Sequence, residues 1–200
     1  MDASAKVQGP RLLQSAQYCI IDPIDTPDGG NVGTHKHLTM MAKISNNISG
    51  FKIKEWLFKT YDKYLIKIEK CKPNYLYYVT KIMLNGIWIA STNNPTDLLN
   101  DLKNKRRLGK FENIPNNISK TISITFHIKL NVIYIFTDSG RLMRPLYYTL
   151  ENKDKESKIS ILSNENVLDK VYKDDINWND FLYYIDYLDS CEIEDSYICL

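Results

Sequence analysis

The chain has 200 residues, a length that can bury a hydrophobic core without disulfides and that allows one domain or two small ones. Its 26 Lys and Arg residues nearly balance its 24 Asp and Glu residues, which leaves a formal net charge of +2. This balance excludes a protein that binds nucleic acid through bulk charge, so any basic surface must be a local patch.

The cysteines and histidines predict no metal site. Cys19, Cys71, Cys191 and Cys199 show no metal-knuckle spacing, and no signal peptide precedes them, so reduced thiols are expected. His35 and His37 are two apart, and residues at that spacing do not share a helix face. The apolar runs are too short to span a bilayer, so no membrane partner is predicted.

In chain order, the first predicted elements surround a segment rich in turn-forming residues, 22–33. We expect a buried strand at 18–21, ended by the Asp22-Pro23 step, and a helix between Gly33 and Ala42. Pro27-Asp28-Gly29 is typical of a tight turn. These residues alone fit a rigid surface turn as well as a functional site. Residues 45–50 are the first expected boundary.

The middle of the chain predicts two helices and a hairpin. Apolar residues at spacings of three and four favour a helix over 51–64. Residues 76–92 form two β-rich runs joined by Asn85-Gly86, a strong hairpin signal because both turn residues tolerate positive φ. A second helix should start at Pro95 and end at Gly109, with a buried stripe of leucines.

The last third returns to β structure. Alternating apolar residues predict a strand over 121–130, and a second strand over 132–137 makes a hairpin that turns near Asn131. We expect a polar loop at 152–166, a helix at 178–187, and a chain truncated within the apolar run 197–200. The predicted fold class is therefore α+β, with β-hairpins and flanking short helices.

Four basic residues gather near the end of the second helix: Lys103, Arg106, Arg107 and Lys110. Cations stabilise a helix C-terminus, so this placement has a purely structural explanation. The alternative is a basic binding patch. The sequence leaves both interpretations open.

Three ordered stretches resemble one family. Residues 11–18 followed by Pro-Ile-Asp-Thr-Pro-Asp-Gly-Gly-Asn-Val-Gly at 23–33 are similar to the second-largest subunit of multisubunit DNA-directed RNA polymerases. Asn85-Gly86-Ile87-Trp88 with Arg106-Arg107 looks like its hairpin and Arg-Arg helix. Thr137-Asp138-Ser139-Gly140-Arg141, followed by Arg144-Pro145-Leu146, is similar to a third family segment.

The resemblance implies a fragment of a larger multidomain subunit, without catalytic activity by itself. It implies the end of the fork region at 1–45, a first part of the external domains at 50–112, and a second part with an acidic tail at 113–200. The function implied is template-directed RNA synthesis, with the largest subunit, other subunits, the DNA template and the RNA–DNA hybrid as partners. Mg²⁺ would be bound mainly by the largest subunit, and none by this fragment.

For the site, the resemblance places the turn beside the nucleotide and the RNA 3′ end. Arg11 is expected to pair with phosphate, because a planar guanidinium suits that partner, and Asp25, Asp28 and Asn31 are expected near the nucleic acid. The alternative for Asp28 and Asn31 is bonding to the loop's own backbone. Arg141 and Arg144 are expected to make structural ion pairs in the external domain.

The sequence also departs from the family pattern. Gln14 stands where the family usually has a histidine, and Cys19 stands where it has a glycine. The Asp-Thr-Pro-Asp-Gly-Gly-Asn form resembles the versions in large DNA viruses, which implies the cytoplasm or nucleus of a host cell, or the virion. The alternative function is a non-catalytic nucleic-acid-binding or scaffold protein that retains the fork motif.

Overall fold

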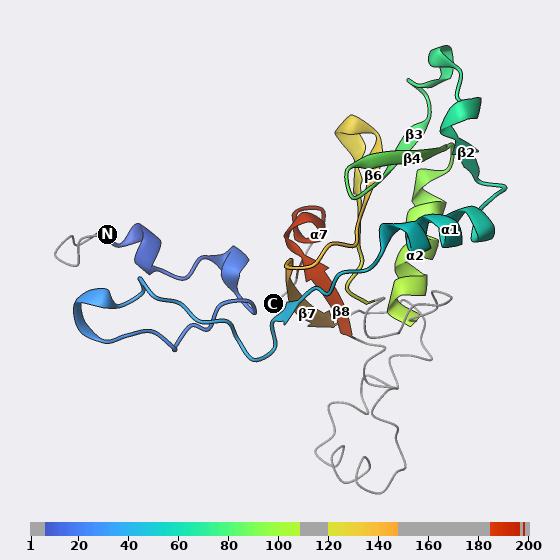
Figure 1. Ribbon diagram of the computed structural model, residues 1–200. Coiled ribbons are helices and arrows are strands. Elements are labelled where there is room, and N and C mark those ends of the chain that lie inside the picture. Colours follow the sequence, from blue (N-terminus) through green and yellow to red (C-terminus); the bar gives the residue numbers. More distant parts are fainter. Residues whose placement is uncertain (1–6, 109–119, 148–184, 197, 199–200) are drawn as a thin grey trace, which may run out of the picture.

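The computed structural model describes residues 7–108, 120–147, 185–196 and 198. Figure 1 shows three parts in succession: an extended arm at residues 7–42, a small sheet, and a larger sheet with two long helices. The arm lies on one side of the small sheet, and the larger sheet lies on the other. Both helices and sheets are present, so the predicted α+β class is confirmed.

The elements of the arm and the first half of the chain are mostly short. They are η1 (Gly9–Arg11), η2 (Ser15–Gln17), η3 (Gly29–Asn31), β1 (Lys43–Ile44), α1 (Gly50–Thr60), β2 (Leu65–Lys67), η4 (Ile68–Lys70), η5 (Pro73–Tyr75), β3 (Thr80–Leu84) and β4 (Ile87–Thr92). The remaining described elements are α2 (Pro95–Leu108), β5 (Ser123–His127), η6 (Ile128–Leu130), β6 (Val132–Phe136), β7 (Leu142–Tyr147), β8 (Ile185–Asp189) and α7 (Ser190–Glu194).

The larger sheet has five strands in the order β2-β4-β3-β6-β5. All neighbours are antiparallel except β3 and β6, which pair in parallel with Ile82 opposite Ile133 and Leu84 opposite Ile135. Because alternate strand residues point to the same face, these four side chains form one apolar surface. Strands from the expected ranges 50–112 and 113–200 therefore share this sheet.

Two helices contribute to the core on the apolar side of the sheet. α1 buries Ile53, Trp56 and Leu57, and α2 buries Leu98 and Leu102, all in one cluster with the sheet residues. Where the helices meet, the Tyr61 hydroxyl donates to an Asp101 carboxylate oxygen. Burial and the Asp101 carboxylate raise the pKa of Tyr61 above its usual range.

The predicted hairpins are confirmed, and asparagines account for both turns. Asn85 and Gly86 have φ of 47° and 81°, and Asn131 has φ of 52°. The Asn85 side chain also accepts from the Thr137 backbone N–H at 2.8 Å and donates to its hydroxyl at 2.8 Å. This pair ties the hairpin tip to the end of β6.

The second sheet contains β1, β7 and β8 in the order β1-β7-β8, with both pairs antiparallel. It begins where the arm ends, and the Ser45 hydroxyl donates to the Asp138 carbonyl at 2.8 Å. The expected helix over 178–187 is wrong for its described part, because residues 185–187 belong to β8. Its residues 178–184, Lys110 and the predicted loop at 152–166 lie outside the described residues.

Three other local predictions are wrong. Residues 18–20 form turns and Ile21 a single bridge rather than a buried strand: Tyr18 is exposed, and Cys19 has φ of 64°. Residues 34–42 form no helix, because Leu38 lies antiparallel to Ile21 and pairs with it in that bridge. The alternation of 121–130 does not continue past His127, since η6 follows and leaves Ile128 and Leu130 exposed.

Candidate functional site: the turn at residues 22–33

The turn 22–33 is the end of a closed loop in the arm. Ile21 and Leu38 form an isolated antiparallel bridge. On either side of it, the Asp22 N–H donates to the His37 carbonyl at 2.8 Å, and the Thr39 N–H donates to the Ile20 carbonyl at 3.0 Å. These bonds fix the two ends of the turn against each other. The bridge replaces the strand and helix that the apolar residues here predict.

Asp22 organises the entry to the turn. Its Oδ1 accepts from the backbone N–H groups of Ile24 at 2.8 Å and Asp25 at 3.2 Å. This is an Asx-type turn, in which a carboxylate replaces a backbone acceptor. The N–H of Ile24, then that of Asp25, lowers the pKa of Asp22 below its usual range. The entry is therefore built around an ionised carboxylate.

Thr26 joins the two sides of the loop. Its hydroxyl accepts from the Gly33 N–H at 2.8 Å and donates to the His35 carbonyl at 3.1 Å. A hydroxyl can serve both roles at once because it carries one donor and two lone pairs. Thr26 thus fixes the return of the chain after η3.

Arg11 holds the turn from outside the loop. Its Nη1 donates to the carbonyl oxygens of Gly30 at 2.7 Å and Val32 at 2.9 Å. Gly33 is buried and has φ of 73°, and a Cβ placed on it would lie 2.2 Å from the Arg11 carbonyl oxygen. Only glycine fits at such a distance. Arg11 and Gly33 therefore form one close backbone contact, supported by the guanidinium.

The turn leaves three polar side chains at its surface. Asp25, Asp28 and Asn31 are all exposed. Asp28 precedes η3 without a side-chain cap bond, and the Asn31 main-chain carbonyl accepts from the Thr34 hydroxyl at 2.7 Å. Asp25 Oδ2 lies 3.9 Å from His37 Nδ1. The Asx bond expected as the alternative for Asp28 and Asn31 is made by Asp22 instead.

The turn contains no nucleophile paired with a base. It offers carboxylate and amide groups on a backbone that is held by Arg11, Asp22 and Thr26. Polar groups on a fixed backbone are suited to orienting a bound partner. Among the described residues, no cluster of three or more His, Cys, Asp or Glu side chains is placed to hold a metal ion.

The basic residues of α2 do not form one exposed patch. Arg106 is fully buried, Lys103 and Arg107 are half-buried, and Lys110 lies outside the described residues. Arg106 Nη1 lies 2.5 Å from Glu192 Oε1, and its Nη2 lies 3.0 Å from both Asp186 oxygens. Arg107 Nε donates to Asp186 at 2.9 Å. The arginine pair therefore binds the acidic residues of β8 and α7.

Glu192 is the other centre of this buried cluster. Its Oε1 also accepts from the Ile124 backbone N–H at 2.5 Å, so it links α7 to β5. Burial raises the pKa of Glu192, although the Arg106 charge and the hydrogen bonds act in the opposite direction. Burial lowers the pKa of Lys103 beside the cluster. These charges join α2, β5, β8 and α7.

Arg141 and Arg144 connect the small sheet to its neighbours. Arg141 Nη1 donates to Asp189 Oδ2 at 2.8 Å, and its Nη2 donates to the Thr121 carbonyl at 2.8 Å, which confirms the expected structural ion pair. Buried Arg144 instead donates to the Ala16 carbonyl at 2.5 Å. That bond attaches the arm to β7.

Sequence reasoning missed the residues that shape the turn. Asp22 and Thr26 carry the side-chain bonds, and Lys36 Nζ donates to the Leu12 carbonyl at 3.0 Å. An Asp immediately before Pro23 is a known turn signal that could have identified Asp22. The acids that pair with Arg106 lie 80 and 86 positions away, a distance over which no local pattern operates.

Two models of known protein families match this chain, each over a different range of residues. A family model described as RNA polymerase Rpb2, domain 3, matches residues 1–44, and one described as RNA polymerase Rpb2, domain 4, matches residues 82–149. Together these ranges include more than half of the chain, with the turn in the first and β6 and most of β3 in the second.

Three curated relatives agree with these matches. DNA-directed RNA polymerase III subunit RPC2 of Saccharomyces cerevisiae is 32% identical over 203 residues, covering 100% of this chain and 16% of that protein. RNA polymerase II subunit RPB2 of Encephalitozoon cuniculi is 28% identical over 202 residues, with 100% and 16% coverage. DNA-directed RNA polymerase subunit 2 of Acanthamoeba polyphaga mimivirus is 30% identical over 159 residues, with 76% and 12% coverage.

The chain spans about one sixth or less of the length of these relatives. No helix in the described part of the chain is long and apolar enough to cross a membrane. The order of the matched domains follows the order of the sequence motifs. The chain belongs to the family of second subunits of DNA-directed RNA polymerase.

Proposed function

We propose that this chain contributes to template-directed RNA synthesis as part of the second subunit of an assembled DNA-directed RNA polymerase. In this proposal the arm is the end of the fork region, and its turn faces the nucleotide and the RNA–DNA hybrid. The observation that carries the proposal is the Arg11 contact: two carbonyl bonds and a close approach to Gly33 hold an otherwise exposed turn.

Exposed apolar side chains on the arm support an assembled state. Ile24 is 85% exposed and Met40 fully exposed, and Met41 and Leu12 are also exposed. Large exposed apolar residues that cluster on one segment mark an interaction surface. We infer that other parts of the subunit, the largest subunit or further subunits cover the arm.

The proposed roles divide between positioning and contact. Asp25, Asp28 and Asn31 would lie close to nucleic acid or nucleotide, and Arg11 would hold their backbone while its charge favours nearby phosphate. Mg²⁺ would be bound mainly by the largest subunit, and this chain would supply no metal ligand. The enzyme would work in the cytoplasm or nucleus of a host cell, or in the virion.

The test uses the assembled polymerase with the full-length second subunit. Arg11→Ala should slow elongation by up to about 100-fold, because a small misplacement beside a reacting centre is costly, and Asp28→Ala should also slow it. Lys129→Ala, which changes an exposed lysine of η6, is the matched control. The salt dependence of Arg11→Lys would separate a charge effect from a shape effect.

Two results would contradict the proposal. One is unchanged elongation in both Arg11→Ala and Asp28→Ala enzymes that assemble normally. The other is template-directed synthesis by the 200-residue chain without any other subunit.

A further inference from the structure

The connection between β2 and β3 carries an unusual number of exposed aromatic side chains. Tyr75, Tyr77 and Tyr78 are 60%, 85% and 78% exposed. Tyr77 and Tyr78 meet edge to face with ring centroids 5.5 Å apart. In Figure 1 this connection projects at the far end of the molecule from the arm. None of these rings is needed for the core.

The same stretch carries positive charge without a compensating acid. From Lys70 to Thr96 the sequence contains Lys70, Lys72 and Lys81 but no Asp or Glu. Lys70 and Lys72 are exposed. Lys81 is half-buried, and its Nζ lies 5.4 Å from the centre of the Trp88 ring. Lysines and exposed tyrosines thus follow one another along a single segment, which we call the tyrosine lobe (residues 70–81).

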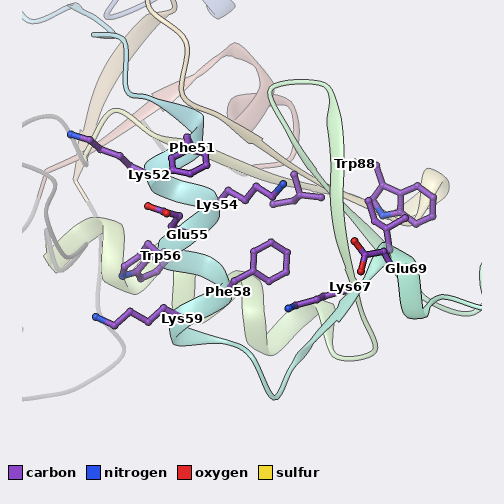
Figure 2. A pocket seen from close by; sticks show the side chains of 12 residues that line it. Phe51, Lys52, Lys54, Glu55, Trp56, Phe58, Lys59, Lys67, Glu69 and Trp88 are labelled. Atoms are coloured by element: carbon purple, nitrogen blue, oxygen red, sulfur yellow. The ribbon is translucent and has the colours of Figure 1, made fainter.

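A groove of about 850 Å³ lies beside the tyrosine lobe, between α1 and the adjoining strands. Figure 2 shows Lys54 and Phe58 reaching from α1 toward the side that carries Lys67 and Trp88. Lys67 Nζ lies 5.8 Å from the centre of the Phe58 ring. The groove therefore continues the same pairing of cations with aromatic rings.

This groove also contains negative charge. Glu69 lies beside Trp88 on the strand side (Figure 2), and Glu55 lines the groove from α1. A polyanion would be repelled at these points, so its phosphates are expected along Lys70, Lys72 and Lys81 instead. The acid-free lobe is thus the stronger anion-binding part of the surface.

We propose that the tyrosine lobe and the adjoining groove bind single-stranded nucleic acid without sequence preference. Unpaired bases stack on exposed tyrosine rings, while flexible lysines contact the backbone phosphates. A duplex buries its base faces and offers little to these rings. This site lies in a different part of the chain from the turn and does not depend on the function proposed for it.

The test measures binding of a labelled oligouridylate of about ten nucleotides, a length within the known site sizes of single-strand-binding folds. Fluorescence anisotropy with the 200-residue chain should show saturable binding that weakens as salt rises. The Lys70→Gln, Lys72→Gln double variant should make the slope of log affinity against log salt shallower by about 1.4, at about 0.7 per lysine.

The aromatic contribution is tested separately. Tyr77→Ala and Tyr78→Ala should each weaken binding by at least about fivefold, the lower limit for loss of one stacked base. Both side chains are exposed, so folding should be preserved, which circular dichroism checks. Tyr18→Ala and Lys129→Gln change exposed residues elsewhere and should leave the affinity unchanged.

Several outcomes would overturn the proposal. These are no binding by the folded chain, equal affinity for a duplex of the same sequence, or unchanged affinity in both tyrosine variants. Displacement of the oligouridylate by an acidic peptide at a lower concentration would assign the surface to a protein partner instead.

Discussion

Different interactions stabilise the arm and the larger sheet. In the sheet, apolar side chains from α1, α2 and the strands are buried in one cluster, and buried ion pairs attach β8 and α7. In the arm, Gly33 is the single buried residue among 7–42, and the chain is held by bonds from Arg11, Asp22 and Thr26. The arm therefore has a defined local shape but little burial of its own.

The difference indicates which substitutions should affect the stability of the whole molecule and which should have local effects. A change in the buried cluster removes support from several elements, so it should lower global stability. A change in the arm alters one loop, so it should affect local structure and, in our proposal, activity in the assembled enzyme.

The largest effect is expected in the buried ion cluster. Arg106→Met leaves Asp186 and Glu192 buried without their main cation, which should lower the free energy of unfolding by about 3–5 kcal/mol. Urea denaturation measures this loss. Arg107→Met, which changes a partly exposed arginine, should cost less.

A double variant checks the cause of that loss. Adding Glu192→Gln to Arg106→Met removes one uncompensated buried charge, so the double variant should be more stable than Arg106→Met alone. If it is equally or less stable, the cost comes from lost packing of the arginine side chain.

A second prediction concerns Gly33. Gly33→Ala should shift the NMR signals of residues 26–36 and Arg11, because the added methyl group would overlap the Arg11 carbonyl. The global free energy of unfolding should change by less than about 0.5 kcal/mol, because opening this loop relieves the strain without unfolding the core. A larger global loss would show that the arm contributes to the core's stability.

Gly29→Ala is the matched control for this experiment. Gly29 has φ of 76°, close to the 73° of Gly33, but a Cβ on Gly29 would meet no atom within 4 Å. Both variants carry the same backbone strain. A larger disturbance in Gly33→Ala therefore measures the close contact alone.

The sequence predictions were correct for the larger sheet and its helices more often than for the arm. Asn85-Gly86, Asn131 and Pro95 predicted their turns and helix start correctly, because local backbone chemistry determines those features. The strand at 18–21 and the helix at 34–42 do not form, because the two segments meet in the single bridge between Ile21 and Leu38. Ile20 and Ile21 instead line a cavity against Leu142 of β7 and Asp189 of β8.

The candidate site was only partly predictable. The density of Pro and Gly at 22–33 indicated a rigid turn, and the turn is held as expected. The Arg11 bonds to Gly30 and Val32 were not predictable, because they depend on how two separate segments meet. The role of Arg106 was not predictable for the same reason. Its place near the end of α2 suggests a cation that stabilises the helix terminus, but its partners lie far away in the sequence, on β8 and α7.

The smallest expected effect is the pH response of the turn entry. The pKa of Asp22 is lowered from 3.8, so its bonds to Ile24 and Asp25 should persist above that value and be lost as pH falls through the lowered pKa. NMR titration of the two amide signals measures the midpoint. Asp22→Asn keeps an acceptor that does not titrate, so the part of the shift that depends on Asp22 should be absent. A midpoint at or above 3.8 would contradict the Asx bond.

Native-state hydrogen exchange on the 200-residue chain tests the contrast between the two regions most directly. Amides of the arm, 7–42, should exchange through local openings of low free energy, whereas amides of β3, β4 and β6 should exchange only when the whole core unfolds. Mass spectrometry or NMR resolves both groups in one experiment. If the arm amides exchange as slowly as those of β3 and β6, the arm belongs to the same cooperative unit as the core, which contradicts the proposed difference between the two regions.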